Sequence, residues 1–145
     1  MKRFDKLAPL SRERQMMLIL AQVLKTDTPD YKGLPTDIIG KQRYSQKLFH
    51  ELILPHFQFE EQELFPAVSG IHHEIDQLIY ILIDDHAEIT RQIELMEGDT
   101  KIALGSEQSL NDLGVSIEGH IRLEEREFFE LVQRHVDETL LPDFG

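Results

Sequence analysis

The stretch His56-Phe-Gln-Phe-Glu-Glu-Gln-Glu-Leu-Phe-Pro66 returns in similar form as His120-Ile-Arg-Leu-Glu-Glu-Arg-Glu-Phe-Phe129. Both copies place a Glu four residues after the His, and they share two further Glu and a Phe. On an α-helix this spacing puts the His and the Glu on one face, one turn apart. An imidazole nitrogen and a carboxylate oxygen presented together suit iron, zinc or manganese. Two such helices facing each other would enclose a metal site inside a helix bundle.

The composition narrows the possible functions. A length of 145 residues predicts one domain over residues 1–145, and the formal net charge of −12 argues against nucleic acid, whose phosphates require a basic patch. No apolar run reaches the ~18 residues that cross a bilayer. The N-terminus leads into no apolar signal core, so we expect a cytoplasmic protein without a membrane partner. The absence of cysteine excludes thiolate and iron–sulfur sites, so any metal must be held by His and carboxylate.

Hydrophobic periodicity predicts four helices and no strand. The expected helices cover residues 12–25, about Thr36 or Asp37 to Leu64, His72 to Glu97, and about Ser106 to Val136. Ser11 is expected to cap the first helix, and Pro66 to end the second. Pro55 lies inside the second helix, where its missing N–H should bend the helix or open its hydrogen bonding. These lengths and mostly short connections predict an all-α, antiparallel, up-and-down four-helix bundle.

Polar residues interrupt the apolar stripes of three of these helices. They are His56, Glu60, His86, His120 and Glu124. Burying an unpartnered carboxylate costs several kcal/mol, so these groups need an ion, a cationic side chain or shared protons. A single core histidine such as His86 is more often only hydrogen-bonded, but the repeat of a whole segment favours a metal site.

The other acidic and imidazole side chains are expected at the surface. We expect Glu61, Glu63, Glu125 and Glu127 on solvated helix faces, and His50, His72, His73 and His135 off the buried stripes.

The motifs together resemble the hemerythrin-like, HHE cation-binding family. The resemblance rests on the two repeated segments, Asp85-His86 and the opening Leu7-Ala-Pro-Leu-Ser-Arg-Glu13, so it extends over nearly the whole chain. It implies an up-and-down four-helix bundle with a non-haem di-iron centre. Members bind oxygen, handle iron, or respond to oxygen, nitric oxide or redox conditions.

The resemblance also implies roles for the buried polar residues. It assigns His56 to one iron and His86 and His120 to the other, with Glu60 and Glu124 between the two.

The first helix departs from the family pattern. The family usually carries a ligand His after the Arg-Glu of its opening motif, whereas this chain reads Arg12-Glu13-Arg14-Gln15. The periodicity turns Arg14 inward, and a protonated guanidinium cannot bind a metal.

Three hypotheses follow. In the first, which we favour, the intact residues bind one metal ion, or two with help from Glu13 or Gln15. In the second, Arg14 replaces the metal charge, pairs with Glu60 or Glu124 in a bidentate fork, and leaves a metal-free structural or interaction module. In the third, a di-iron centre performs oxidation and the protein is an enzyme. The metal could be iron, zinc or manganese.

Overall fold

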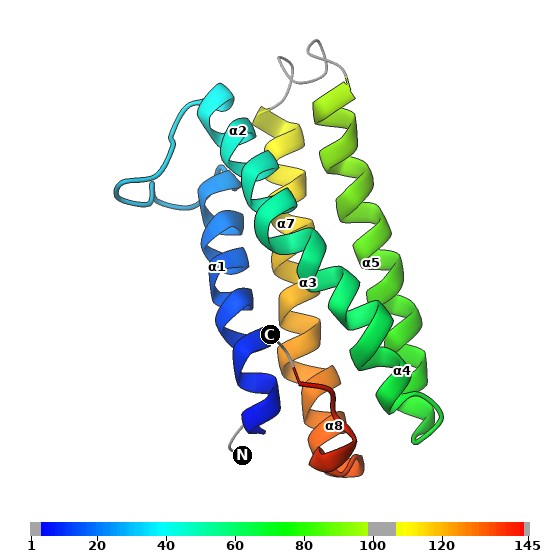
Figure 1. Ribbon diagram of the computed structural model, residues 1–145. Helices are drawn as coiled ribbons and strands as arrows, with labels where there is room; N and C mark the ends of the chain where they lie inside the picture. The colour runs from blue at the N-terminus through cyan, green and yellow to red at the C-terminus, as the bar shows by residue number, and fades with distance from the viewer. Residues whose placement is uncertain (1–3, 99–106, 144–145) are drawn as a thin grey trace.

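The structure, a computed structural model, describes residues 4–98 and 107–143. Within these two ranges the chain is all-α and has no strand, and its long helices run alternately up and down as an antiparallel bundle (Figure 1). The predicted all-α four-helix bundle is confirmed. None of the described helices is long and apolar enough to cross a membrane.

Four helical rods make up the described bundle, and two of them consist of several segments. The first rod is α1 (Ala8–Leu24), and the third is α5 (His73–Gly98). The second rod contains α2 (Ile38–Leu48), a π-helical segment (Phe49–Ile53), α3 (Leu54–Phe59), a second π-helical segment (Glu60–Leu64) and α4 (Phe65–Val68). The fourth rod contains α7 (Glu107–Leu123), a π-helical segment (Glu124–Phe128) and α8 (Phe129–His135). Short 3-10 turns cover Asp5–Leu7 and Glu138–Leu140.

The rods begin close to the predicted residues, with one clear exception. Helix α1 starts at Ala8 rather than at residue 12, because Pro9 lies in the first turn, where an absent N–H breaks no helical hydrogen bond. Ser11 is therefore not the N-cap. Asp37 caps α2 by accepting a hydrogen bond from the backbone N–H of Gly40. The predicted start at Ser106 lies outside the described residues.

Two prolines sit inside the second rod without ending it. The predicted end at Leu64 is wrong, since the rod continues past Pro66 to Val68. The prediction of altered hydrogen bonding around Pro55 is confirmed, because a π-helical segment ends at Ile53, two residues before it. The second π-helical segment likewise lies just before Pro66. A proline ring clashes with the carbonyl four residues earlier, and the wider π turn relieves that clash.

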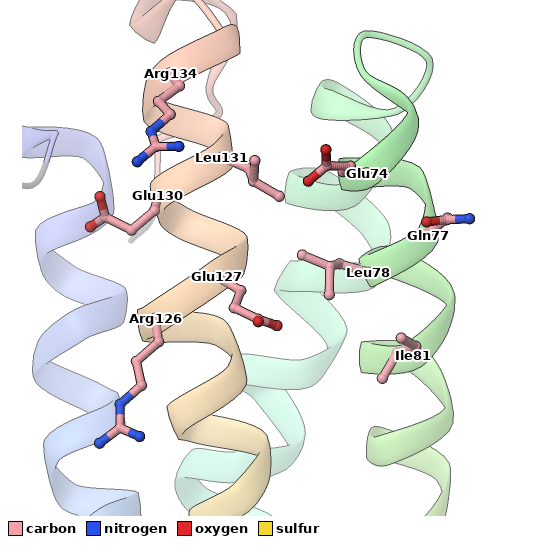
Figure 2. A pocket seen from close by; sticks show the side chains of 9 residues that line it. All are labelled: Glu74, Gln77, Leu78, Ile81, Arg126, Glu127, Glu130, Leu131 and Arg134. Atoms are coloured by element: carbon pink, nitrogen blue, oxygen red, sulfur yellow. The ribbon is translucent and has the colours of Figure 1, made fainter.

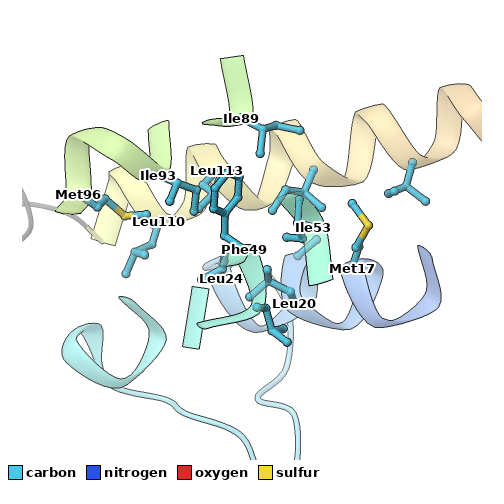
Figure 3. Packing of buried hydrophobic residues seen from close by; sticks show 14 of the residues in the cluster. Met17, Leu20, Leu24, Phe49, Ile53, Ile89, Ile93, Met96, Leu110 and Leu113 are labelled. Carbon is cyan, nitrogen blue, oxygen red and sulfur yellow. The ribbon is translucent and has the colours of Figure 1, made fainter. Parts of the chain in front are cut away.

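The buried side chains form two apolar clusters stacked along the bundle axis. The cluster near the α2 end, part of which is drawn in Figure 3, includes Met17, Phe49, Ile93 and Leu113. The cluster near the α8 end includes Leu10, Phe65, Leu82 and Phe128. Every rod contributes to both clusters. On each rod the buried polar residues lie at or next to the positions where one cluster ends and the other begins.

Two glycines of α7 test the packing between α1 and α7. A Cβ at Gly114 would lie 2.9 Å from the backbone oxygen of Ala21, whereas a Cβ at Gly119 would meet no described atom within 4 Å. Gly114→Ala should therefore lower the free energy of unfolding by about 1–3 kcal/mol through overpacking. Gly119→Ala should raise it by ~1 kcal/mol, because alanine favours the helix. Urea denaturation measures both, and a shift of both variants in the same direction would contradict the described packing.

Candidate metal centre

A layer of buried polar side chains lies between the two apolar clusters. Its members are Arg14, His56, Glu60, His86, His120 and Glu124, and none is more than 2% exposed. Helix α1 supplies the arginine, α5 supplies one histidine, and the second and fourth rods each supply a His and a Glu from the repeated segment. The structure thus buries together every residue that the sequence predicted for the site.

Four of these residues present metal-binding atoms to a single point. One ligand atom from each of Glu60, His86, His120 and Glu124 lies within 4.8 Å of the other three. The Nε2 atom of His120 is 2.8 Å from Glu124 Oε1, and the Nε2 atom of His86 is 3.1 Å from Glu60 Oε1. His56 lies at the edge of this group, with its Nε2 atom 3.6 Å from Glu60 Oε2.

The inward-facing atoms of the four residues lack hydrogen bonds. The Nε2 atoms of His86 and His120 and all four carboxylate oxygens of Glu60 and Glu124 are buried, and none forms a hydrogen bond of acceptable geometry with the described residues. Buried polar atoms are almost always hydrogen-bonded, since leaving one unsatisfied costs about 1–3 kcal/mol and more for a charged group. A metal ion would satisfy all of these atoms at once, so the residues fit a divalent cation.

The outward-facing nitrogen of each buried histidine contacts a second carboxylate on another rod. The Nδ1 pairs are His56 with Glu13 at 2.8 Å, His86 with Glu61 at 2.7 Å, and His120 with Asp85 at 3.0 Å. A histidine that binds a metal usually donates its other ring N–H to such a group, which fixes the tautomer and raises the basicity of the ligand nitrogen. All three rings are therefore oriented with Nε2 toward the centre.

Two of the carboxylates that contact buried bases lie on helix faces that were expected to be solvated. Glu61 was expected on a solvated face, and although its side chain is 40% exposed it contacts His86. Glu125 was expected there too, yet it accepts a hydrogen bond from Arg14. The sequence did contain one signal for these carboxylates, which is their place next to an inward-facing residue. This holds for Glu13, Glu61, Asp85 and Glu125. A residue one step around the helix from an inward-facing residue can point its side chain toward the next rod.

Most of the other side chains that were expected at the surface are exposed to solvent. Glu63, Glu127, His50, His73 and His135 are exposed as predicted. His72 is half-buried instead, because its ring stacks on that of His135 at a centroid distance of 3.9 Å.

Two aromatic rings pack against His86. Phe57 stacks on its ring at a centroid distance of 3.8 Å, and Phe65 lies roughly parallel to it at 5.9 Å. His86, Phe57 and Glu61 also line a pocket of about 420 Å³ between α3 and α5. His86 is therefore the member of the polar layer that borders this pocket.

Arg14 faces the centre from α1 but does not form the predicted fork with Glu60 or Glu124. Its Nε donates to Glu125 at 2.7 Å, and its Nη2 donates to the hydroxyl of Ser11 at 2.7 Å. Its Nη1 lies 3.6 Å from Glu124 Oε2, which is within ion-pair range but too long for a hydrogen bond. The expectation of a bidentate pair with a central carboxylate is wrong, because Nε donates to Glu125 and Nη2 donates to Ser11.

The two central carboxylates have opposite pKa shifts. Burial raises the pKa of Glu60, but the charge of His56 and the neighbouring imidazoles outweigh it, so this pKa lies well below its ordinary value. Burial and the charge of Glu60 together raise the pKa of Glu124. This is the behaviour of two like charges sharing one site, where one group ionises at the expense of the other.

The same carboxylates hold protons on two of the histidines. Burial lowers the pKa of His120, but the charge of Glu124 and the hydrogen bond to Asp85 outweigh it and raise this pKa to about 9. Burial likewise opposes the charge of Glu60 at His56, whose pKa is raised to about 10. A cation at the centre would take the place of these protons.

A second groove lies apart from the polar layer. It runs between α5 and the segment from Arg126 to Arg134, with Leu78, Ile81 and Leu131 inside a charged rim (Figure 2). No residue of the polar layer lines this groove, so it is not part of the candidate centre.

Comparison with known families gives one match. The family model described as hemerythrin HHE cation binding domain matches residues 11–132. No curated protein and no solved structure matches the chain.

The outer carboxylates can be tested with two neighbouring aspartates. Asp85→Asn should weaken metal binding about 10- to 100-fold, because it removes the anionic partner of His120. Asp84→Asn, at the adjacent exposed position, is the control and should leave the affinity unchanged. Competition with a chromophoric chelator measures both affinities, and equal affinities would contradict the role of Asp85.

Metal binding should also release protons near neutral pH. Because His120 holds a proton up to about pH 9, a metal ion must displace that proton at pH 7. The affinity should therefore rise from pH 6 to pH 8, by about tenfold per pH unit for each proton displaced. Calorimetric titrations in two buffers of different ionisation enthalpy count the protons, and a binding enthalpy independent of the buffer would contradict this expectation.

Proposed function

The chain belongs to the hemerythrin HHE cation binding family, and we propose that it binds non-haem iron through Glu60, His86, His120 and Glu124. The observation that carries this proposal is that these four residues hold six buried ligand atoms without hydrogen bonds to the described residues. One such ligand atom from each residue lies within 4.8 Å of the other three. The family implies a cation. The choice of iron over zinc or manganese rests on the family resemblance, because two imidazoles and two carboxylates suit all three metals.

The protein would use this centre to handle or sense dioxygen, nitric oxide or iron itself. Bound iron would supply a redox-active ion with an affinity for small gases, whereas the protein supplies position and access. Phe57 and Phe65 fix the ring of His86, and Asp85 fixes the tautomer of His120. The pocket between α3 and α5 gives small molecules a route to His86. We propose a binding or sensing role rather than an enzymatic one.

A metal-free bundle is the second candidate, and one observation favours it. Arg14 Nη1 lies 3.6 Å from Glu124, so its charge offsets part of the buried negative charge. It leaves both oxygens of Glu60 and both oxygens of Glu124 without hydrogen bonds to described groups. One guanidinium therefore stabilises the layer less completely than a metal ion would.

Metal content decides between the two candidates. Protein purified without a tag and without chelator should contain iron by elemental mass spectrometry, and its near-ultraviolet and visible spectrum should show ligand-to-metal absorption. His120→Ala should lose most of this iron, whereas His73→Ala, at an exposed position, should keep it. A stably helical wild-type protein that takes up no metal from added ferrous iron would overturn the proposal. Under the metal-free alternative, Arg14→Leu should lower the free energy of unfolding by about 3 kcal/mol or more.

A further inference from the structure

The two copies of the repeated segment build two equivalent halves of the polar layer. In each half a central carboxylate lies between two inward-facing bases. The triplets are His56–Glu60–His86 and His120–Glu124–Arg14, with the base-to-carboxylate distances 3.6 and 3.1 Å in the first and 2.8 and 3.6 Å in the second. The layer therefore has an approximate internal two-fold symmetry.

The outer contacts follow the same symmetry, and they make Arg14 the symmetry equivalent of His86. The residue after each central Glu binds the third base of its half. Glu61 contacts His86 Nδ1 at 2.7 Å, and Glu125 accepts from Arg14 Nε at 2.7 Å. Arg14 thus holds the position that His86 holds in the other half, and it is the single base of the four that cannot ligate a metal.

The guanidinium of Arg14 is held rigidly with one donor left over. Glu125 and Ser11 accept from Nε and Nη2, and the planar group lies over the ring of Phe129 at 4.1 Å. The Nη1 atom is buried and makes no hydrogen bond to any described group, although it faces Glu124. A buried, fixed N–H donor beside a metal site is a preorganised binding position for negative charge.

We propose that Arg14 takes the place of a second metal ion, so that the centre holds one ion and binds a small inorganic monoanion between that ion and Nη1 of Arg14. This inference rests on the proposed metal site, and it adds a stoichiometry and a class of ligand to it. The anion is held by the charge and the N–H of the guanidinium.

Metal stoichiometry tests the first half of this proposal. Elemental mass spectrometry of cobalt-loaded protein should give one ion per chain for the wild type and two for Arg14→His, because the new imidazole completes the symmetric set. Two ions in the wild type, or one ion in Arg14→His, would overturn the inference while leaving the proposed metal site intact. No ion in the wild type would overturn the proposed metal site itself.

Azide titration tests the second half. Azide should change the visible bands of the cobalt-loaded wild type, and Arg14→Met should weaken azide binding about 10- to 100-fold at an unchanged content of one ion per chain. Arg126→Met removes an exposed arginine and is the matched control, which should bind azide as the wild type does. Arg14→Lys is the more conservative variant, which should weaken azide binding by less because it keeps the charge without the planar fork. Equal azide affinities in the wild type, Arg14→Met and Arg14→Lys would overturn the proposal.

Discussion

Two carboxylates buried side by side impose the main energetic constraint on this bundle. Glu60 and Glu124 are fully buried, and their four oxygens form no hydrogen bonds to the described groups. Like charges in a low-dielectric interior repel strongly, so this layer is stable only if positive charge is brought to it. Three imidazoles and one guanidinium surround the carboxylates, and an outer set of carboxylates fixes the orientation of each of these bases. We interpret the whole layer as a preformed cation site whose remaining charge is supplied by a metal ion.

The helical framework makes this arrangement possible in two ways. The apolar clusters on either side of the layer draw side chains from all four rods and so pack the rods against one another. Within the rods, a π-helical segment begins at each central glutamate, at Glu60 and again at Glu124. Segments of this kind are rare and often mark functional sites. Their recurrence at the same position of both repeats shows that the two halves share one local geometry as well as one motif.

Most of the fold and the inner residues of the site could be predicted from the sequence. Helical periodicity is a strong signal over segments as long as α5, and the polar interruptions of the stripes identified all six members of the buried layer, including Arg14. The repeat was decisive, since a single His-x-x-x-Glu in an acidic chain carries little information. The continuation past Pro66 was not predictable in the same way, because it depends on a π turn that no local residue preference announces.

The carboxylates that contact the buried bases were harder to predict from the sequence. A carboxylate next to an inward residue looks like an ordinary solvated side chain until the distance to the neighbouring rod is known, and this is why Glu61 and Glu125 were misplaced. Whether Arg14 binds Glu124 or Glu125 also depends on the distance between neighbouring rods, and sequence periodicity does not give this distance.

Anomalous X-ray diffraction from crystals of the metal-loaded protein would locate the metal directly. We expect one strong anomalous peak per chain, bounded by Glu60, His86, His120 and Glu124, with the guanidinium of Arg14 beside it. A metal-loaded crystal without density in the polar layer, or with its peak at the surface pair His72 and His135, would contradict the interpretation of this layer as a metal centre.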